Sequence, residues 1–301
     1  MLGSIHDADD ALQDALLRAW RGMHRFEGRS APRTWLHRIA TNACLDALAR
    51  RPRRVLPVDY GPPSDPLDPG QRLATSVWIE PYPDLELGDI EGRSAPEARY
   101  EAREAIELAF VAALQHLPPR QRAVLILRDV LGFSSRETAE TLATTAVAVD
   151  SALQRAHKTI GQRLPDRSQQ TTIRSLGDAR VRNLVERLID AFERGEVRAI
   201  IALLAEDATF EMPPYTAWCR GRDAIATSWL MPEGPPPRLR YVPTWANGQP
   251  AMGTYRHDSA GGYMPIALDV LTLMGDRVSA VTVFRTPEIF ARFRLPHRLA
   301  V

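Results

Sequence analysis

The 301-residue sequence predicts a multidomain protein with two all-α domains, the second a helix-turn-helix, followed by an α+β domain. Apolar residues recur at helical spacing in the first 56 residues and again near the middle of the chain. In the last third, helices are followed by a run of strands, which is typical of an α+β fold. We therefore expect three domains and two linkers, with boundaries at 1–56, 57–97 (linker), 98–164, 165–177 (linker) and 178–299.

The composition is that of a soluble globular protein, with 45% apolar residues, 25% charged residues and a net charge of +1. A nucleic-acid footprint would therefore have to be local. Cys44 and Cys219 are too few for a disulfide framework, and the chain has neither a long apolar run nor a signal-peptide profile, which favours the cytoplasm. His37 and Cys44 fall seven apart on one predicted helical face, but without a third ligand nearby we expect no metal and no cofactor.

The segment 6–22 predicts the first helix. Asp7 is its expected N-cap, and arginines near its end suit the helix dipole. Leu12, Leu16 and Trp20 recur at helical spacing, so we expect them to face the interior. The polar residues between them would then form a solvated face.

A turn-rich connection leads to a second predicted helix, 35–54. Trp35 heads its apolar stripe and is expected in the core. Between Arg18 and Arg54, ten arginines stand against two acidic residues. A basic stripe of this kind suits the phosphate backbone of a nucleic acid.

Residues 57–97 change character. Proline and glycine are frequent and nine acidic residues stand against two arginines, which predicts a linker. The run Val77–Asp84 carries apolar and aromatic side chains that are unusual in a solvated tether. It is either a loop packed on a neighbouring domain or an anchor, on a partner or on the chain's own C-terminal domain.

The stretch from Leu117 to Ile160 predicts the helix-turn-helix. Ser134 and Glu137 have the spacing of a capping box, and Thr145 can cap the helix that follows. That last helix buries an apolar face and turns a polar face outward. From periodicity alone, an ordinary helical hairpin with a solvated face remains the alternative.

After a polar break at 166–172 we expect a mixed α+β segment. The predicted helices are 181–192, 197–204 and 223–230, and the predicted strands are 208–212, 239–245, 251–257, 263–274 and 277–285. Asp269 shares a strand face with Leu271 and Leu273. It is therefore either an acid with a raised pKa in an apolar setting or a structural hydrogen-bonding group.

Three blocks in order, Leu117–Arg122, Gly132–Ala139 and Ser151–Ala156, resemble the promoter-reading C-terminal domain of bacterial sigma-70-family factors of the extracytoplasmic-function (ECF) group. Asp7–Arg21 is similar to the sigma helix that docks on the clamp coiled coil of RNA polymerase. Phe26–Asp46 looks like the sigma region that melts and reads the minus-ten element. In this family another helix precedes the first one. Either the natural start lies upstream and the first domain is N-terminally truncated here, which we expect, or the domain lacks a packing partner for Leu12, Leu16 and Trp20.

The resemblance implies a transcription initiation factor without catalysis of its own, whose partners are core RNA polymerase and promoter DNA. The implied polymerase-binding residues are Asp10, Gln13, Asp14 and Arg18. The implied DNA-binding residues are Arg33, Arg38, Asn42, Thr145, Val147, Ser151, Gln154, Arg155 and Lys158. The loop from Glu27 to Ser30 would lie beside a base extruded from the minus-ten element, and the helix after Thr145 would read the minus-35 element in the major groove.

Ala199–Pro214 and Cys219–Ile225 resemble the SnoaL-like branch of the cone-shaped fold shared with ketosteroid isomerases. Such cones enclose a pocket, for which the lining candidates are Glu211, Tyr215, Trp218, His257, Tyr263 and Asp269. Behind a sigma core, this domain is expected to modulate activity by packing on the linker or on the other domains, or by sensing a small ligand. The alternatives are an isomerase-like enzyme or ligand sensor with a DNA-binding appendage, and a stand-alone repressor or activator that binds duplex DNA without polymerase.

Overall fold

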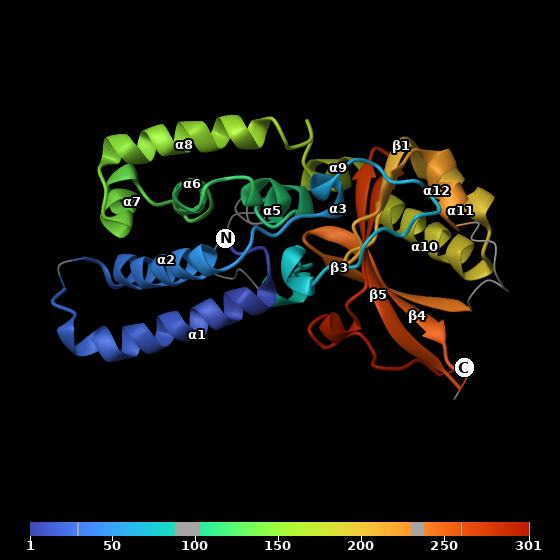
Figure 1. Ribbon diagram of the computed structural model, residues 1–301, viewed down its shortest axis with the longest axis horizontal. Helices are drawn as coiled ribbons and strands as arrows, with labels where there is room; N and C mark the ends of the chain where they lie inside the picture. The colour runs from blue at the N-terminus through green and yellow to red at the C-terminus, as the bar shows by residue number, and fades with distance from the viewer. Residues whose placement is uncertain (29, 88–102, 230–237, 260, 301) are drawn as a thin grey trace. The chain divides into compact units, whose positions relative to one another are not determined.

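The computed structural model describes residues 1–301 except 29, 88–102, 230–237, 260 and 301 (Figure 1). The chain divides into two compact units. The first contains Met1–Val55 and Leu108–Asp166, and the second contains Leu56–Glu107 and Arg167–Val301. The two helical segments thus fold as one unit, and the linker between them belongs to the unit of the last third.

The two N-terminal helices run side by side in the first unit (Figure 1). α1 spans Ile5–Gly22 and is capped by Ser4, whose hydroxyl accepts a hydrogen bond from the N–H of Asp7 at 3.1 Å. Asp7, the predicted N-cap, is instead buried, and its carboxylate pairs with Arg54 at 2.8 Å. α2 spans Pro32–Arg50, and its proline occupies the first turn, where a missing N–H costs nothing.

The buried face of α1 carries small side chains. Its buried alanines are Ala11, Ala15 and Ala19. The prediction that Leu12, Leu16 and Trp20 face the interior is wrong, because these residues are 54%, 57% and 74% exposed. Both rows repeat every four residues and lie next to each other on the helix. The alanine row lets the backbones of α1 and α2 approach closely, and this leaves the bulky row outside.

The rest of the first unit is the predicted helix-turn-helix. Its elements are α5 (Leu108–Gln115), α6 (Pro119–Leu125), a π-helical turn (Ile126–Val130), α7 (Ser135–Leu142) and α8 (Ala146–Gly161). Residues 98–102, where we expected the first helix of this domain to begin, lie outside the described residues.

The caps of the helix-turn-helix are those that the sequence predicts. Ser134 accepts a hydrogen bond from the N–H of Glu137 at 3.2 Å, and the Glu137 carboxylate accepts one from the N–H of Ser134 at 2.8 Å. Thr145 caps α8 by accepting from the N–H of Ala148 at 3.2 Å. Ala143 ends α7 in the left-handed region, with φ of +50°, and so makes the tight turn.

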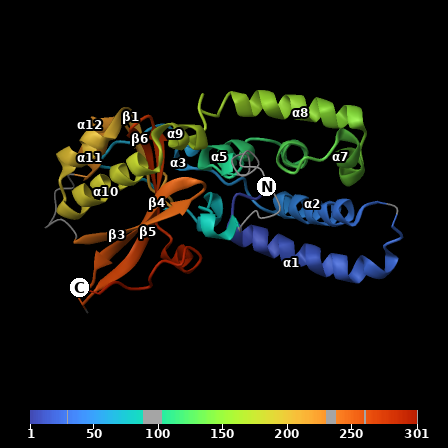
Figure 2. The same ribbon diagram turned by 180° about the vertical axis from the view of Figure 1, so that it is seen from behind.

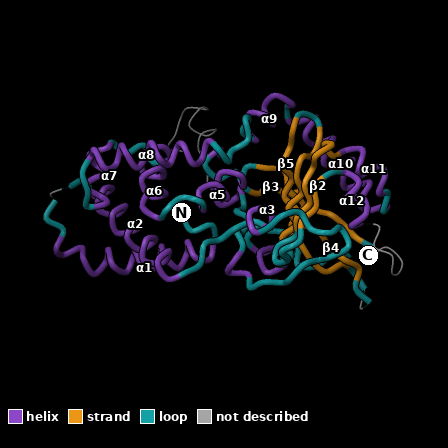
Figure 3. The backbone as a smooth tube through the Cα atoms, turned by 45° about the horizontal axis from the view of Figure 1, so that its top comes forward, coloured by secondary structure: helices purple, strands orange, loops and turns teal. Residues whose placement is uncertain are grey.

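The second unit is built on a six-stranded sheet with the strand order β2-β1-β6-β5-β4-β3. The strands, orange in Figure 3, are β1 (Leu204–Glu211), β2 (Trp218–Arg220), β3 (Leu239–Ala246), β4 (Gln249–His257), β5 (Tyr263–Met274) and β6 (Arg277–Phe284). β1 and β6 are parallel, and the other neighbouring pairs are antiparallel. α10 (Asp178–Arg194), α11 (Val197–Leu203) and α12 (Arg222–Trp229) pack on one face and bury the main core against it (Figure 2).

A helix precedes this core where we expected a second linker. α9 spans Gln169–Leu176 and is capped by Ser168. The buried side chain of Gln169 donates to the carbonyl of Leu273 at 3.0 Å and accepts from its N–H at 2.7 Å. The register of β4 and β5 ends at Val270, and Leu273 lies beyond it, so the amide satisfies the backbone groups of Leu273 in place of a strand.

The described part of the acidic linker packs on the sheet of the second unit. It contains α3 (Pro57–Tyr60) and two short 3-10 turns. Trp78 and Ile79 are 3% and 1% exposed. Tyr82 and Asn247 exchange two hydrogen bonds, at 2.9 and 2.8 Å, which fix the linker to the β3–β4 hairpin. The run from Val77 is therefore an anchor on the chain's own C-terminal domain.

None of the helices in the described part of the chain combines the length and the apolar composition that crossing a bilayer requires.

Candidate polymerase and promoter interfaces

The outward face of α1 combines acidic and apolar side chains. Asp10, Gln13 and Asp14 are exposed, as the sequence predicts. Arg18 is held between two carboxylates, with its guanidinium 2.9 Å from Asp46 and 2.6 Å from Asp14, and these hydrogen bonds raise the pKa of Arg18. The exposed leucines and tryptophan of the outer row lie on this helix too. The face therefore offers both charge and apolar area to a protein partner.

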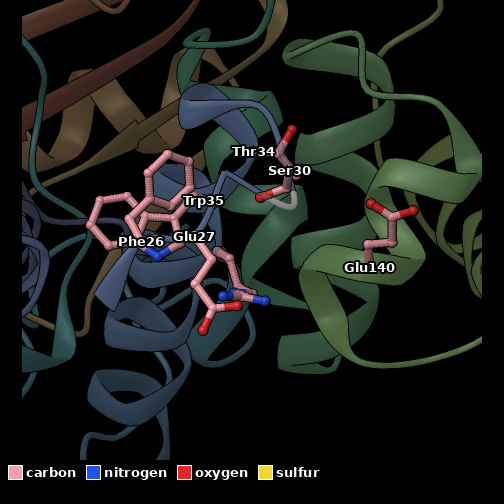
Figure 4. A pocket seen from close by; sticks show the side chains of 7 residues that line it. Phe26, Glu27, Ser30, Thr34, Trp35 and Glu140 are labelled. Carbon is pink, nitrogen blue, oxygen red and sulfur yellow. The ribbon is translucent and has the colours of Figure 1, made fainter. Parts of the chain in front are cut away.

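A cavity of about 480 Å³ opens beside the loop between α1 and α2 (Figure 4). It is lined by Phe26, Glu27, Ser30, Thr34, Trp35, Arg38 and Glu140. The rings of Phe26 and Trp35 lie 5.1 Å apart between centroids and form one wall. Two aromatic rings, a cation and hydroxyl groups can hold a planar base together with its phosphate.

A second cavity, of about 350 Å³, shares part of this lining. Trp35 and Arg38 border both cavities, and Asn42 and Arg18 complete the second one. Trp35 is only half-buried, so its ring belongs to these cavities as much as to the core that we predicted for it. The two cavities therefore bring Glu27, Ser30 and Asn42 close to Arg38.

Arg33 contacts the segment that precedes α7. It donates to the carbonyl of Leu131 at 2.8 Å and lies over the Phe133 ring, 5.0 Å from its centroid. His37 stacks on the same ring, with 5.1 Å between the centroids. Helix α2 therefore packs on the segment before α7, and one of the Arg33 donors is used in this contact.

The outer face of α8 carries the residues predicted to read duplex DNA. Val147 is 75% exposed, and Gln154, Arg155 and Lys158 are exposed as well. Ser151 is half-exposed. Among the described residues, no salt bridge ties the two cations to a carboxylate. Their donors thus remain available for phosphate and base edges.

Residues Val149, Ala156 and Ile160 face the core of the first unit, as the sequence predicts. Ser135 donates to Asp150 at 2.6 Å, and His157 contacts Asp129 at 2.6 Å. These contacts link α8 to α7 and to the π-helical turn.

In the second unit, Asp269 lies on the helix-covered face of the sheet. Two residues along the strand, Leu271 joins the core under the helices. The Thr254 hydroxyl donates to Oδ2 of Asp269 at 2.9 Å, while Oδ1 has no hydrogen-bond partner among the described residues. Burial raises the pKa of Asp269 to about 7.

Glu211 lies on the opposite face. The register pairs Glu211 with Thr282 and Thr282 with Val270, which neighbours Asp269, so the two carboxyl groups point to different sides of the sheet. Glu211 accepts hydrogen bonds from the Thr282 hydroxyl at 2.8 Å and from the N–H of Val58, in the linker, at 3.2 Å. Burial raises the pKa of Glu211 to about 7.

The remaining candidates for a common pocket are Trp218, His257, Tyr263 and Tyr215. Trp218 donates its indole N–H to the carbonyl of Gly61, in the linker, at 2.8 Å. His257 and Tyr263 face each other across β4 and β5, with ring centroids 5.3 Å apart. Tyr215 forms an isolated antiparallel β-bridge with Arg72 of the linker. The six residues that we expected to line one pocket are thus divided between the two faces and the ends of the sheet.

Sequence reasoning missed three contributors to the larger cavity. Phe26 and Thr34 flank the loop that we singled out, and their proximity to it was the available signal. Glu140 comes from α7, and nothing in the sequence links it to that loop. In the described residues, no group of three or more histidine, cysteine or acidic side chains could hold a metal ion.

Comparison with known proteins agrees with this geometry. Family models match three parts of the chain: Sigma-70 region 2 at residues 1–54, Sigma-70 region 4 at 107–160 and the SnoaL-like domain at 185–287. The chain is 42% identical to the ECF RNA polymerase sigma factor SigG of Mycobacterium tuberculosis, over 99% of this chain and 80% of that protein. It is 25% identical to SigJ of the same species, over 100% of this chain and 90% of that protein.

The fold has a counterpart among solved structures. The crystal structure of Mycobacterium tuberculosis SigJ, an extracytoplasmic function sigma factor, matches with a TM-score of 0.54 and 21% identity, over 98% of this chain and 93% of that chain. A helical pair of sigma regions followed by a mixed sheet is therefore a shared architecture.

Proposed function

Because the chain belongs to the extracytoplasmic-function group of RNA polymerase sigma factors, we propose a division of tasks among the surfaces described above. Sigma factors are initiation factors, which direct core polymerase to the minus-ten and minus-35 elements of promoters. The observation that carries the assignment is that the two sigma regions occur in order, in one chain, with the polar faces of α1 and α8 exposed. This function places the protein in the cytoplasm, with polymerase and DNA.

The outward face of α1 docks on core polymerase. Asp10, Gln13 and Asp14 would meet basic groups of the clamp, and the exposed leucines and Trp20 would bury apolar area there. Arg18 already bonds Asp14 and Asp46, so it acts by fixing the position of the Asp14 carboxylate. This supports a docking surface with a preset geometry.

A binding assay tests this docking surface. The double variant Asp10→Lys with Asp14→Lys is expected to weaken binding of the full chain to core polymerase by tenfold or more, because like charges would face each other. Glu186→Lys, at an exposed site on α10, is the matched control and should bind as the unaltered chain does. Equal binding by all three proteins would remove α1 from the interface.

The two cavities around Trp35 receive melted minus-ten DNA. One flipped base would lie against the rings of Phe26 and Trp35, while Arg38 neutralises its phosphate and Asn42 reads a base edge. Reactivity of unpaired thymines in the holoenzyme–promoter complex measures this step. Trp35→Ala should reduce promoter opening by about tenfold, since base stacking contributes ~1–3 kcal/mol, and should leave duplex binding unchanged.

The helix α8 reads the minus-35 element. Ser151 and Gln154 are placed to contact base edges, and Arg155 and Lys158 to contact phosphates on either side. Thr145 and Val147, at the start of the helix, would enter the groove first. Cap, exposure and charge of this helix all support the assignment.

The SnoaL-like domain modulates initiation through the docked linker. Trp78 and Ile79 of the linker are buried in the same unit as this domain. The linker must therefore leave the domain before it can move. Run-off transcription by the full chain with Trp78→Ala and Ile79→Ala is the test. A change in output of several-fold, relative to the unaltered chain at equal polymerase occupancy, is expected, and identical output would refute modulation by this route.

Binding of a small ligand by the same domain is a second candidate function. The observation that favours it is Asp269, whose Oδ1 is buried without a partner in the described residues. A ligand with a hydrogen-bond donor would satisfy that atom.

A further inference from the structure

A third cavity, of about 250 Å³, lies where the linker crosses the second unit near the end of β6. Arg72 of the linker and Arg285, just after β6, both line it. The remaining walls are the ring of Tyr215, Ile266 and three prolines. The lining thus combines two cations with an apolar and aromatic surface.

Neither guanidinium is neutralised by a carboxylate in the described part of the chain. Among the described residues, no carboxylate lies within ion-pair distance of Arg72 or Arg285, and none lines the cavity. Arg285 lies over the Tyr215 ring, 5.9 Å from its centroid, and its Nη1 is 3.9 Å from the sulfur of Met212. Each guanidinium carries five N–H donors in a planar fork that fits a carboxylate or a phosphate.

The backbone on both sides of the cavity is fixed. In the linker, the N–H of Leu73 donates to the carbonyl of Pro214 at 3.0 Å, and the carbonyl of Gln71 accepts from the N–H of Thr216 at 3.0 Å. A side chain at Gly70, whose φ is +70°, would place its Cβ 2.6 Å from the Thr216 hydroxyl. The two arginines thereby lie on backbone segments that are ordered before a ligand binds, which lowers the entropy cost of binding a ligand between them.

Arg285 is held by the same segment. Its N–H donates to the carbonyl of Pro213 at 2.9 Å, next to the residues that bond the linker. The segments that carry both cations are therefore hydrogen-bonded to residues 213–216.

We propose that this cavity binds a small organic anion, whose carboxylate or phosphate lies between Arg72 and Arg285 and whose body packs on Tyr215, Ile266 and the prolines. The volume is below the ~300 Å³ at which pockets for drug-sized ligands begin, which limits the ligand to a small metabolite. Because one cation is on the linker and the other on the sheet, the bound anion ties the linker to the SnoaL-like domain. The regulatory part of the proposal rests on the modulation proposed above.

Calorimetric titration of the full chain with benzoate, phenyl phosphate and inorganic phosphate tests the site without polymerase. One of the two aromatic anions is expected to bind at least tenfold more tightly than inorganic phosphate, and the stronger of them identifies the anionic group. Arg72→Gln and Arg285→Gln should each weaken that binding tenfold or more, because each removes a charge-assisted contact. Arg220→Gln, an exposed arginine that lies over Trp218 outside the cavity, is the control.

Binding that is equal in the unaltered chain, Arg72→Gln and Arg285→Gln would overturn the site. Inorganic phosphate that binds as tightly as phenyl phosphate would overturn the role of the apolar walls. Limited proteolysis supplies a second readout: the bound anion should slow cleavage of the linker severalfold in the unaltered chain and not in Arg72→Gln. A failed titration leaves the sigma assignment intact, since that assignment is tested by polymerase binding.

Discussion

Replacing Asp269 by Asn is expected to stabilise the second unit at neutral and alkaline pH. The carboxyl group is buried, and it has a single hydrogen-bond partner, Thr254, among the described residues. An amide of the same shape keeps that bond, because its oxygen can accept from the Thr254 hydroxyl. The variant therefore removes a buried charge and little else.

The magnitude follows from the pKa. Burial raises it from the ordinary 3.8 to about 7 in the folded protein. Folding thus favours the protonated form, so the contribution of Asp269 to stability is fully present below pH 3.8 and is lost as pH rises to about 7. About three pKa units correspond to roughly 4 kcal/mol, of which about 2.5 kcal/mol is lost between pH 5 and pH 8. For a unit of this size the latter is a difference in melting temperature of roughly 5–10 °C.

Urea unfolding of the full chain, followed by tryptophan fluorescence at pH 5 and pH 8, measures this difference. The advantage of Asp269→Asn over the unaltered chain should grow between the two pH values by about 2.5 kcal/mol. Asp276→Asn, in the exposed β5–β6 turn, is the matched control and should show no such growth. Glu211 is present in all three proteins, so its effect on the pH dependence of unfolding is the same in each. Parallel curves for Asp269→Asn and the unaltered chain would refute the reasoning.

Three further outcomes are expected. Arg155→Ala should weaken promoter binding across sequences and reduce the slope of log affinity against log salt by about 0.9, one phosphate contact, and a change only in sequence preference would contradict its assigned role. Trp78→Ala should lower the free energy of unfolding of the second unit by about 3–5 kcal/mol in a urea titration, whereas a loss below about 1 kcal/mol would mean that the linker does not dock. Ser134→Ala, which removes the cap of α7, should lower the melting stability of the first unit by about 1 kcal/mol, and an unchanged transition would show that the cap is dispensable.

The helix-turn-helix could be predicted from sequence because its signals are local. Ser134 with Glu137 and Thr145 before α8 each act within one helical turn, so they are independent of the rest of the fold. The buried face of α8 follows from the 3.6-residue period for the same reason. The caps and the periodicity thus predict which face of α8 is exposed in the structure.

The wrong predictions concern residues whose burial depends on a neighbouring helix or strand. On α1 two apolar rows compete, and the closest approach to α2 selects the alanines, although the leucine row has more apolar area. In α9, Gln169 is buried because Leu273 extends beyond the β4–β5 register and leaves backbone groups for it to bond, whereas its sequence alone indicates a solvated linker. The candidates Glu211 and Asp269 were grouped by residue type, whereas the strand register separates them onto two faces.

The stacking of His37 on Phe133 sets a condition on how this protein meets a promoter. The rings lie 5.1 Å apart, one on α2, beside the cavities around Trp35, and the other just before α7. The two DNA elements are centred about 25 base pairs apart, which is roughly 85 Å of duplex at 3.4 Å per base pair. On the assignments proposed above, we expect a first unit closed by this contact to engage one element at a time. On this expectation, separation of α2 from the segment before α7 accompanies assembly with polymerase, and the uncomplexed protein does not occupy a complete promoter.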